Sequence, residues 1–256
     1  MKLPEWYVVY PGIYDNYRPV MSPYEAFLSM FTWHTETLNI YTHLLPGLYY
    51  LWELMTLKDE GSLEKQFLVY VSYSGAAIMG ITSGLAHTFF IIDRSWNDFS
   101  WKLDFLGIIS INLAHILLDT FVLSRLLHIP FIPFAALEVA FSLYCCYGII
   151  SDIHIGRFWG LMYPAITCIP LTSVAYIYSR IIGAEQVFLE ITDASIMCSL
   201  YIMVAGLVFF KGGFPERYYN AGGIFNILNS HVLHHIFINV SIVAAFEALP
   251  KLYLID

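Results

Sequence analysis

The sequence predicts an all-α integral membrane protein built as a bundle of seven transmembrane helices. Of its 256 residues, 58% are hydrophobic and only 12% are charged, whereas soluble domains carry about 25% charged residues. Apolar runs, most of them close to the roughly 20 residues that cross a bilayer as a helix, alternate with short polar connections. Together these two observations favour a polytopic helical membrane protein over any soluble class.

Seven apolar runs give the predicted spans. They cover residues 39–56, 67–92, 104–126, 130–150, 157–180, 191–211 and 226–249. The break between the third and fourth spans is the shortest, and it is marked by Arg125, His128 and Pro130. Pro164 and Pro170 predict a kink in the fifth span, which neighbouring helices in a membrane tolerate.

One membrane domain therefore fills most of the chain, with a short segment on either side. Residues 1–38 form an N-terminal segment, residues 39–250 the seven-helix domain and residues 251–256 a C-terminal tail. Within the first segment, the apolar stretch from Ser22 to Glu36 is too short to cross, and we expect an amphipathic helix on the membrane surface. No basic region followed by an apolar core opens the chain, so no cleaved signal peptide is predicted.

The distribution of basic residues predicts the orientation. If the N-terminus is cytosolic, the inner segments hold seven basic residues and the outer segments hold five. The inner residues are Lys2, Arg18, Arg94, Lys102, Arg157, Lys211 and Arg217. The outer residues are Lys58, Lys65, Arg125, Arg180 and Lys251. This excess favours a cytosolic N-terminus and an extracytosolic C-terminus. The net charge of −8 gives no basic patch, so no nucleic-acid partner is predicted.

Histidines at the ends of two predicted spans indicate a metal site. The second span ends, and the seventh begins, on the side of the N-terminus, so His87, His231 and His235 lie near one face of the membrane in either orientation. His231 and His235 are four residues apart and share one side of a helix. Two ligands at that spacing and a third from another helix make an open three-histidine zinc site, so these three are the predicted metal ligands.

Two further residues of this layer are the predicted catalytic groups. No glutamate follows His231 as in a His-Glu-x-x-His helix, so the base must come from elsewhere, and Asp104 at the start of the third span is the nearest candidate. Ser83 lies one turn before His87 and is placed to orient a ligand or an oxyanion. His234 points away from the site and is expected to pack against a neighbouring helix or the headgroups.

The alternative to a metal site is structural. Histidines near helix ends also anchor helices at the interface or join them by hydrogen bonds, but three histidines and an aspartate in one layer favour the metal site. The third span also carries a polar stripe on one face: Asp104, Asn112, His115 and Asp119. These residues either line a cavity or hold helices together by hydrogen bonds. A proton or ion pathway is a third interpretation. It is less favoured, because the sequence does not show two halves with interrupted helices at corresponding positions, as many transporters do.

Four blocks of sequence carry a family resemblance. They are His34-Thr-Glu36-Thr-Leu-Asn39-Ile-Tyr-Thr42-His43, Ser83-x-x-x-His87-Thr-Phe, Asp104-x-x-Gly107-Ile, and the stretch from Pro215-Glu-Arg217 to Ser230-His231-x-x-x-His235. In this order they resemble the progestin and adipoQ receptor family, which includes the hemolysin III-like proteins. The sequence departs from that pattern at Thr35, at Asn226 and in a linker before the last span that is one residue longer, and none of these is a proposed zinc ligand.

The resemblance implies both architecture and chemistry. It implies seven helices with a cytosolic N-terminus, zinc bound by His87, His231 and His235, a metal water held by Asp104, Ser83 nearby, and a lipid-accessible cavity. It also implies an activity attributed to several members of the family, the hydrolysis of the amide bond of ceramide, which is linked to receptor signalling. The long N-terminal domain of the animal adiponectin receptors is absent here, so no particular hormone or protein partner is predicted.

The sequence thus predicts a multi-pass protein of the plasma membrane or endoplasmic reticulum, with Zn²⁺ as cofactor and a membrane lipid (ceramide or fatty-acid-like) as ligand. Its predicted activity is that of a zinc-dependent lipid amide hydrolase acting in lipid signalling or homeostasis. The alternative is a non-catalytic receptor or sensor, in which the zinc is structural and closes the cytosolic side of the bundle.

Overall fold

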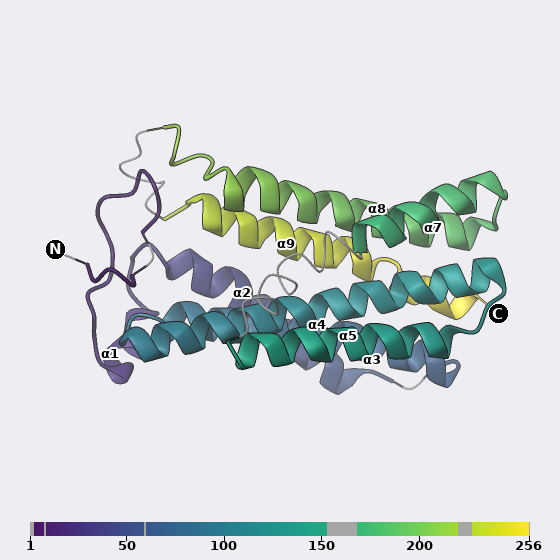
Figure 1. The fold of residues 1–256 in the computed structure, drawn as a ribbon, viewed down its shortest axis with the longest axis horizontal. Helices are drawn as coiled ribbons and strands as arrows, with labels where there is room; N and C mark the ends of the chain where they lie inside the picture. The colour runs from purple at the N-terminus through teal and green to yellow at the C-terminus, as the bar shows by residue number, and fades with distance from the viewer. Residues whose placement is uncertain (1–2, 8, 59, 153–167, 220–226, 256) are drawn as a thin grey trace.

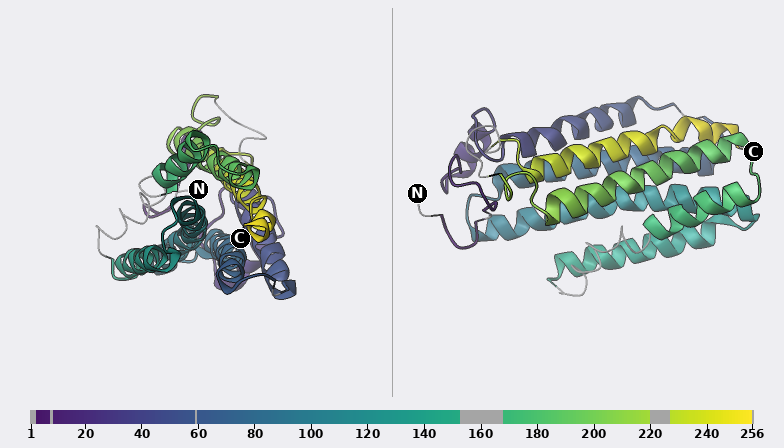
Figure 2. Two further views of the ribbon diagram at one scale, coloured as in Figure 1. Left: turned by 90° about the vertical axis from the view of Figure 1, so that its right-hand side faces the viewer. Right: turned by 90° about the horizontal axis from the view of Figure 1, so that it is seen from above.

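The computed structural model describes residues 3–7, 9–58, 60–152, 168–219 and 227–255, and every regular element within them is a helix (Figure 1). The long helices run side by side along one axis, with the two termini at opposite ends (Figures 1 and 2). In chain order the elements are α1 Pro23–Ser29, α2 Thr37–Thr56, α3 Leu63–Phe89, α4 Arg94–Leu127, α5 Phe131–Ile150, α7 Ile169–Ile181, α8 Gln186–Val204, the π-helix η2 Ala205–Lys211, α9 Ser230–Phe246 and the 3₁₀-helix η4 Leu249–Leu254.

Five helices of the described chain are long and apolar enough to cross a membrane. They are α3, α4, α5, α8 continued by η2, and α9 continued by η4, and each matches one predicted span. The predicted span 39–56 coincides with the 20 residues of α2. The predicted span 157–180 is seen only as α7, because residues 157–167 lie outside the described residues. The all-helical class is confirmed, and the count of seven spans stays a prediction.

The start of α4 differs from the prediction. The stretch from Asp93 to Lys102 was expected to be a polar connection, but the helix begins at Arg94, ten residues before the predicted position 104. The Asp93 side chain accepts the Trp96 N–H at 2.9 Å and caps the helix. No glycine or proline lies between Arg94 and Asp104. At 34 residues α4 is about 51 Å long, which exceeds the roughly 30 Å of hydrocarbon, so its polar turns extend beyond the apolar layer.

The predicted surface helix is shorter than the stretch that suggested it. Ser22 and Glu25 form a reciprocal capping box, and α1 ends at Ser29. Beyond that point the Thr37 hydroxyl donates to the Thr32 carbonyl at 2.8 Å and accepts the His34 N–H at 2.9 Å. These side chains offer the backbone hydrogen bonds that compete with a continued helix.

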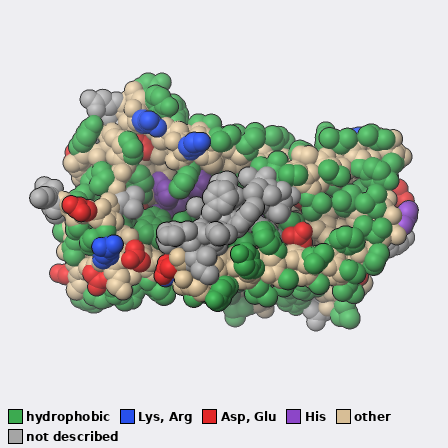
Figure 3. All heavy atoms as spheres, in the orientation of Figure 1, with side chains coloured by type: hydrophobic (Ala, Val, Ile, Leu, Met, Phe, Trp, Pro, Cys, Tyr) green, Lys and Arg blue, Asp and Glu red, His purple; other side chains and the backbone are tan. Residues whose placement is uncertain are grey.

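The outer surface of the bundle is apolar. In α4, 72% of the residues in the most apolar window are buried inside the bundle. In α5, and in α8 with η2, only 28% of that window is buried. Helix α4 is therefore the central helix, and the other two expose most of their apolar residues on the outside of the bundle. Hydrophobic side chains cover most of the face in Figure 3, and the charged ones gather mainly near the end that holds the N-terminus. An exposed apolar surface of this extent is expected in a lipid bilayer and not in water.

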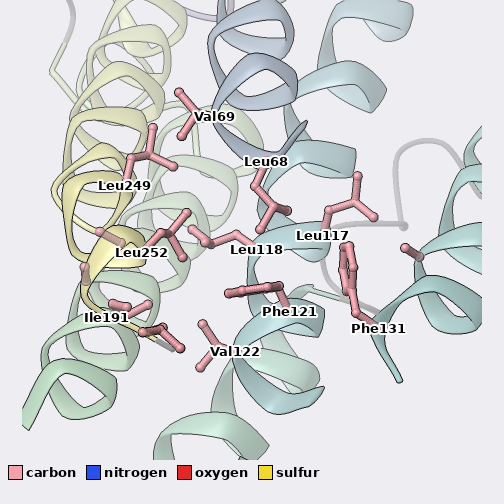
Figure 4. Close-up of a cluster of buried hydrophobic side chains, with 14 of the residues drawn as sticks. Leu68, Val69, Leu117, Leu118, Phe121, Val122, Phe131, Ile191, Leu249 and Leu252 are labelled. Carbon is pink, nitrogen blue, oxygen red and sulfur yellow. The ribbon is translucent and has the colours of Figure 1, made fainter. Parts of the chain in front are cut away.

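A hydrophobic core joins the helices towards the end that holds the C-terminus. Figure 4 shows side chains of α3, α4, α5, α8 and η4 in one cluster. Phe121 of α4 stands between Phe131 of α5, 5.5 Å away between ring centres, and the helices on its other side. This core holds the bundle together far from the polar end described below.

Glycines let α2 and α3 approach closely. A Cβ atom on Gly80 would lie 2.6 Å from the Gly47 Cα and 2.6 Å from the His43 carbonyl oxygen. Small residues at helix crossings are the usual way that membrane helices pack. The crossing matters for the site because α2 and α3 each contribute to it.

We predict that Gly80→Ala destabilises the protein, because the added methyl meets backbone atoms that cannot move aside. Overpacking of this kind costs about 1–3 kcal/mol. The measurement is the thermal unfolding midpoint of the purified protein in detergent. Gly206→Ala is the matched control, since nothing lies within 4 Å of a Cβ at that position. Equal midpoints for the two variants would contradict the prediction.

Candidate metal centre

The three predicted histidines converge near the end of the bundle that holds the N-terminus. His87 comes from the last turn of α3, and His231 and His235 come from the first two turns of α9. All three are buried, and one nitrogen from each lies within 4.8 Å of the others. The Nε2 atoms of His87 and His231 are 3.3 Å apart.

The start of α9 is fixed by polar side chains from distant segments. Asn229 caps the helix by accepting the Val232 N–H at 3.1 Å, and its amide donates to the Thr35 carbonyl at 3.3 Å. The buried Glu216 carboxylate accepts the Ser230 N–H at 2.7 Å. With its first turn held in this way, α9 presents residues four apart on one side towards α3.

A buried carboxylate orients His87. Its Nδ1 lies 2.8 Å from Oε2 of Glu36, which is 1% exposed. The carboxylate also accepts the Tyr10 hydroxyl at 2.9 Å and the Asn39 amide at 2.8 Å. Because an ionised carboxylate only accepts, Nδ1 of His87 carries the proton and the Nε2 lone pair is left towards the other rings. Metal sites use this pairing of histidine with a carboxylate to fix the tautomer.

His235 is oriented in the same sense. Its Nδ1 lies 3.3 Å from the Asn39 carbonyl oxygen and 3.3 Å from the Thr42 hydroxyl oxygen. A carbonyl also only accepts, so the proton of this ring points to α2 and Nε2 faces the centre. The ring of His43 packs on it with centres 3.8 Å apart.

The donor set fits a metal ion. Two nitrogens held tetrahedrally at about 2.0–2.1 Å from zinc are about 3.3–3.4 Å apart, and the His87 and His231 Nε2 atoms have that separation, 3.3 Å. Imidazole nitrogen suits zinc, copper, iron and nickel. The geometry therefore supports a transition-metal site made of three neutral histidines.

Asp104, one of the two predicted catalytic residues, is not part of this three-histidine group. Asp104 of α4 and Ser83 of α3 are buried, at 8% and 2% exposure. Among the described residues, the group whose ligand atoms all lie within 4.8 Å contains the three histidines and not Asp104. The catalytic roles of Asp104 and Ser83 stay predictions. His234 packs against Phe210 of η2 with ring centres 5.3 Å apart, as expected of a residue that is not a ligand.

The N-terminal segment supplies site residues that sequence reasoning did not assign. Arg18 is buried, and its guanidinium donates to the carbonyls of His87 and Thr88 at the end of α3. A cation at this place satisfies free carbonyls and complements the helix dipole. Burial, followed by the charge of Glu36, holds the pKa of Tyr10 well above 10, so its hydroxyl remains a donor to that carboxylate.

One of the overlooked groups had a signal in the sequence. Glu36, Asn39 and His43 recur at spacings of three and four, which places them on one face of a helix. The sequence assigns this face to the entry of the first span and not to the metal site. Tyr10 and Arg18 belong to an irregular segment without periodicity, so nothing in their spacing indicated that they reach the site.

Comparison with known proteins identifies the chain. The model of the haemolysin-III related family matches residues 31–246, which include all three histidines and Glu36. The chain belongs to the haemolysin-III related family. This confirms the resemblance found in the sequence, and with the five apolar helices it makes the protein an integral multi-pass membrane protein.

Relatives of this haemolysin-III related protein are named as receptors. It is 26% identical to the ADIPOR-like receptor IZH2 of Saccharomyces cerevisiae, over 98% of this chain and 82% of the relative. It is 29% identical to membrane progestin receptor delta of Mus musculus, over 88% of this chain and 70% of the relative. A shorter match, 46% identical over 20% of this chain and 14% of the relative, is to heptahelical transmembrane protein 3 of Arabidopsis thaliana.

Proposed function

We propose that this protein is a zinc-containing, receptor-like protein that hydrolyses a lipid amide such as ceramide. Three buried imidazoles converging at one end of an apolar bundle carry the proposal. The proposal includes seven membrane spans and a cytosolic N-terminus. The excess of basic residues in the inner segments supports this orientation. The name of the Arabidopsis relative, a heptahelical protein, supports the number of spans. The plasma membrane and the endoplasmic reticulum are the proposed locations.

His87, His231 and His235 would hold the zinc. When bound, zinc supplies a Lewis acid for the amide carbonyl and lowers the pKa of a water towards 7. The described residues contribute three ligands and no fourth, which is the composition of catalytic zinc sites that keep one position open. Glu36 keeps the His87 ring in the tautomer that presents Nε2.

The remaining chemistry falls to two residues of the chain. Asp104 takes the proton from the attacking water as its oxygen adds to the amide carbon, and then gives a proton to the leaving nitrogen as the C–N bond breaks. Ser83 donates a hydrogen bond to the oxyanion that forms in between. The products are a fatty acid and a long-chain amine, and the water consumed balances the reaction.

The surroundings of the site suit a lipid substrate. The most apolar windows of α5 and of α8 with η2 are only 28% buried inside the bundle, so its outer surface is apolar. A substrate whose acyl chain stays in the bilayer therefore meets the protein along its apolar sides.

The test of this function is ceramide hydrolysis by the purified protein in detergent, with the zinc content determined on the same sample. We expect release of fatty acid at a rate that falls when zinc is removed by a chelator and recovers when zinc is restored. Bound zinc without turnover on ceramide or on other lipid amides would overturn the hydrolase part of the proposal.

A receptor or sensor with a structural zinc is the second candidate. The receptor names of two relatives favour it. In this case the zinc would fix α3 to α9, and the N-terminal segment that covers the site through Tyr10 and Arg18 would respond to the bound state.

We predict that Glu36→Gln weakens zinc binding by about 10–100-fold, the usual effect of losing an outer-shell partner of a metal-bound histidine. The amide keeps the shape of the side chain but loses the charge that holds the proton on Nδ1 of His87. The measurement is the zinc dissociation constant, obtained by competition with a chromophoric chelator. Glu64→Gln is the control, because that carboxylate pairs with Arg125 in another part of the bundle. Equal affinity in both variants would contradict the role of Glu36.

A further inference from the structure

A second polar cluster lies in the interior of the bundle, away from the metal centre. His115 and Asp119 of α4 belong to it, and Asp119 is 15 residues beyond Asp104, which is about 22 Å along the helix. Together with residues of α7 and α8 they line a small cavity; the polar lining residues are His115, Asp119, Cys168, Thr172, Ser195, Cys198 and Ser199. Two of the four residues of the predicted polar stripe, His115 and Asp119, thus line a cavity, and the proposed hydrolase uses neither of them.

Among the described residues that line this cavity, Asp119 is the only one with a carboxylate, and it is 4% exposed. Its Oδ2 accepts the hydroxyl of Thr172, and Ser195 lines the same cavity. None of the ion pairs found among the described residues involves Asp119. His115, one turn earlier on α4, has its Nε2 3.5 Å from the Cys198 sulfur. The carboxylate is therefore surrounded by hydroxyls and has no fixed cation in the described chain.

A lone ionised carboxylate inside a membrane protein is costly, by several kcal/mol, unless something neutralises it. The cavity beside it has about 10 Å³ open to the centre of a water-sized sphere, which is room for one small particle. A proton on Asp119 would neutralise its charge and leave the cavity empty. A small cation would neutralise the charge and also occupy the cavity.

The lining selects the kind of ion. Carboxylate and hydroxyl oxygens are ligands for hard cations. A single carboxylate matches a single positive charge, whereas calcium sites collect six to eight oxygens from several acidic groups. A transition metal is not favoured, because among the described residues His115, Asp119 and Cys198 do not bring their ligand atoms within 4.8 Å of one another.

We propose that this cavity binds one sodium ion between Asp119, Thr172 and Ser195. The ion would join the central helix α4 to α7 and α8, whose residues line the same cavity. Sodium would therefore stabilise the association of these helices. The proposal is independent of zinc and of lipid hydrolysis, and it adds a second ligand to the protein.

The experiment is thermal unfolding of the purified protein at a constant ionic strength of about 0.15 M, with sodium replacing choline in steps, and with potassium in a parallel series. We expect the unfolding midpoint to rise as the sodium concentration increases, because a ligand that binds only the folded state stabilises it. The midpoint should rise much less with potassium. Asp119→Asn should lose this response. Asp193→Asn, an exposed aspartate of α8 paired with Arg180, should keep it.

A direct measurement guards against a variant that does not fold. Equilibrium binding of radioactive sodium to the wild-type protein should give one ion per chain, and Thr172→Val should weaken it while Asp193→Asn leaves it unchanged. The proposal is overturned if sodium, potassium and choline give the same midpoints, if Asp119→Asn keeps the sodium response, or if only pH moves the midpoint, which would show that Asp119 holds a proton.

Discussion

His231→Ala is expected to reduce bound zinc from about one ion per chain to nearly none. Two histidines remain, on two different helices, and neither structural nor catalytic zinc sites are built from so few protein ligands. The measurement is the metal content of the purified protein by mass spectrometry. We also expect the unfolding midpoint of the variant to become insensitive to chelator, because nothing bound to the folded state is left to remove.

His234→Ala is the matched control for this prediction. It removes an imidazole from the same turn of α9, but one whose ring packs on Phe210 and lies outside the group of three. The variant should keep its zinc and its response to chelator. If His234→Ala lost as much metal as His231→Ala, zinc binding would depend on the packing of this whole turn of α9. The assignment of His231 as a ligand would then be wrong.

The inner part of the site could be predicted because it follows helical periodicity. The spacing of His231 and His235 fixes their common face, and counting the spans places His87 at the same end of the bundle. Both arguments use only local geometry and the alternation of crossings. The structure brings these three residues together as expected.

The outer part could not be predicted because it depends on tertiary contacts of an irregular segment. The Tyr10 hydroxyl reaches Glu36, 26 residues away, and Arg18 reaches the end of α3, about 70 residues away. No period links such positions. The early start of α4 could not be predicted for a different reason. Hydropathy marks the membrane layer, whereas a helix that is capped in the polar region, with no glycine or proline between Arg94 and Asp104, begins before that layer.

Asp104 is the residue on which the choice between enzyme and sensor depends. If it transfers the proton, Asp104→Asn should lower turnover by about 10²–10⁴-fold, the usual contribution of a general acid–base group. Zinc content should remain unchanged, because this side chain is outside the group of ligand atoms. The measurement pairs the rate of ceramide hydrolysis with metal analysis on the same preparation.

Asp98→Asn is the control, since it makes the same change of charge at an exposed position on the same helix. An enzyme predicts that only Asp104→Asn loses activity while both variants keep zinc. Loss of zinc in Asp104→Asn would instead make the carboxylate a support for the ligands. If the wild-type protein holds zinc and both variants behave like it in every assay, no proton passes through Asp104. If the wild-type protein also has no turnover on lipid amides, the buried histidines would serve to join α3 to α9 beneath the N-terminal segment, as the sensor requires.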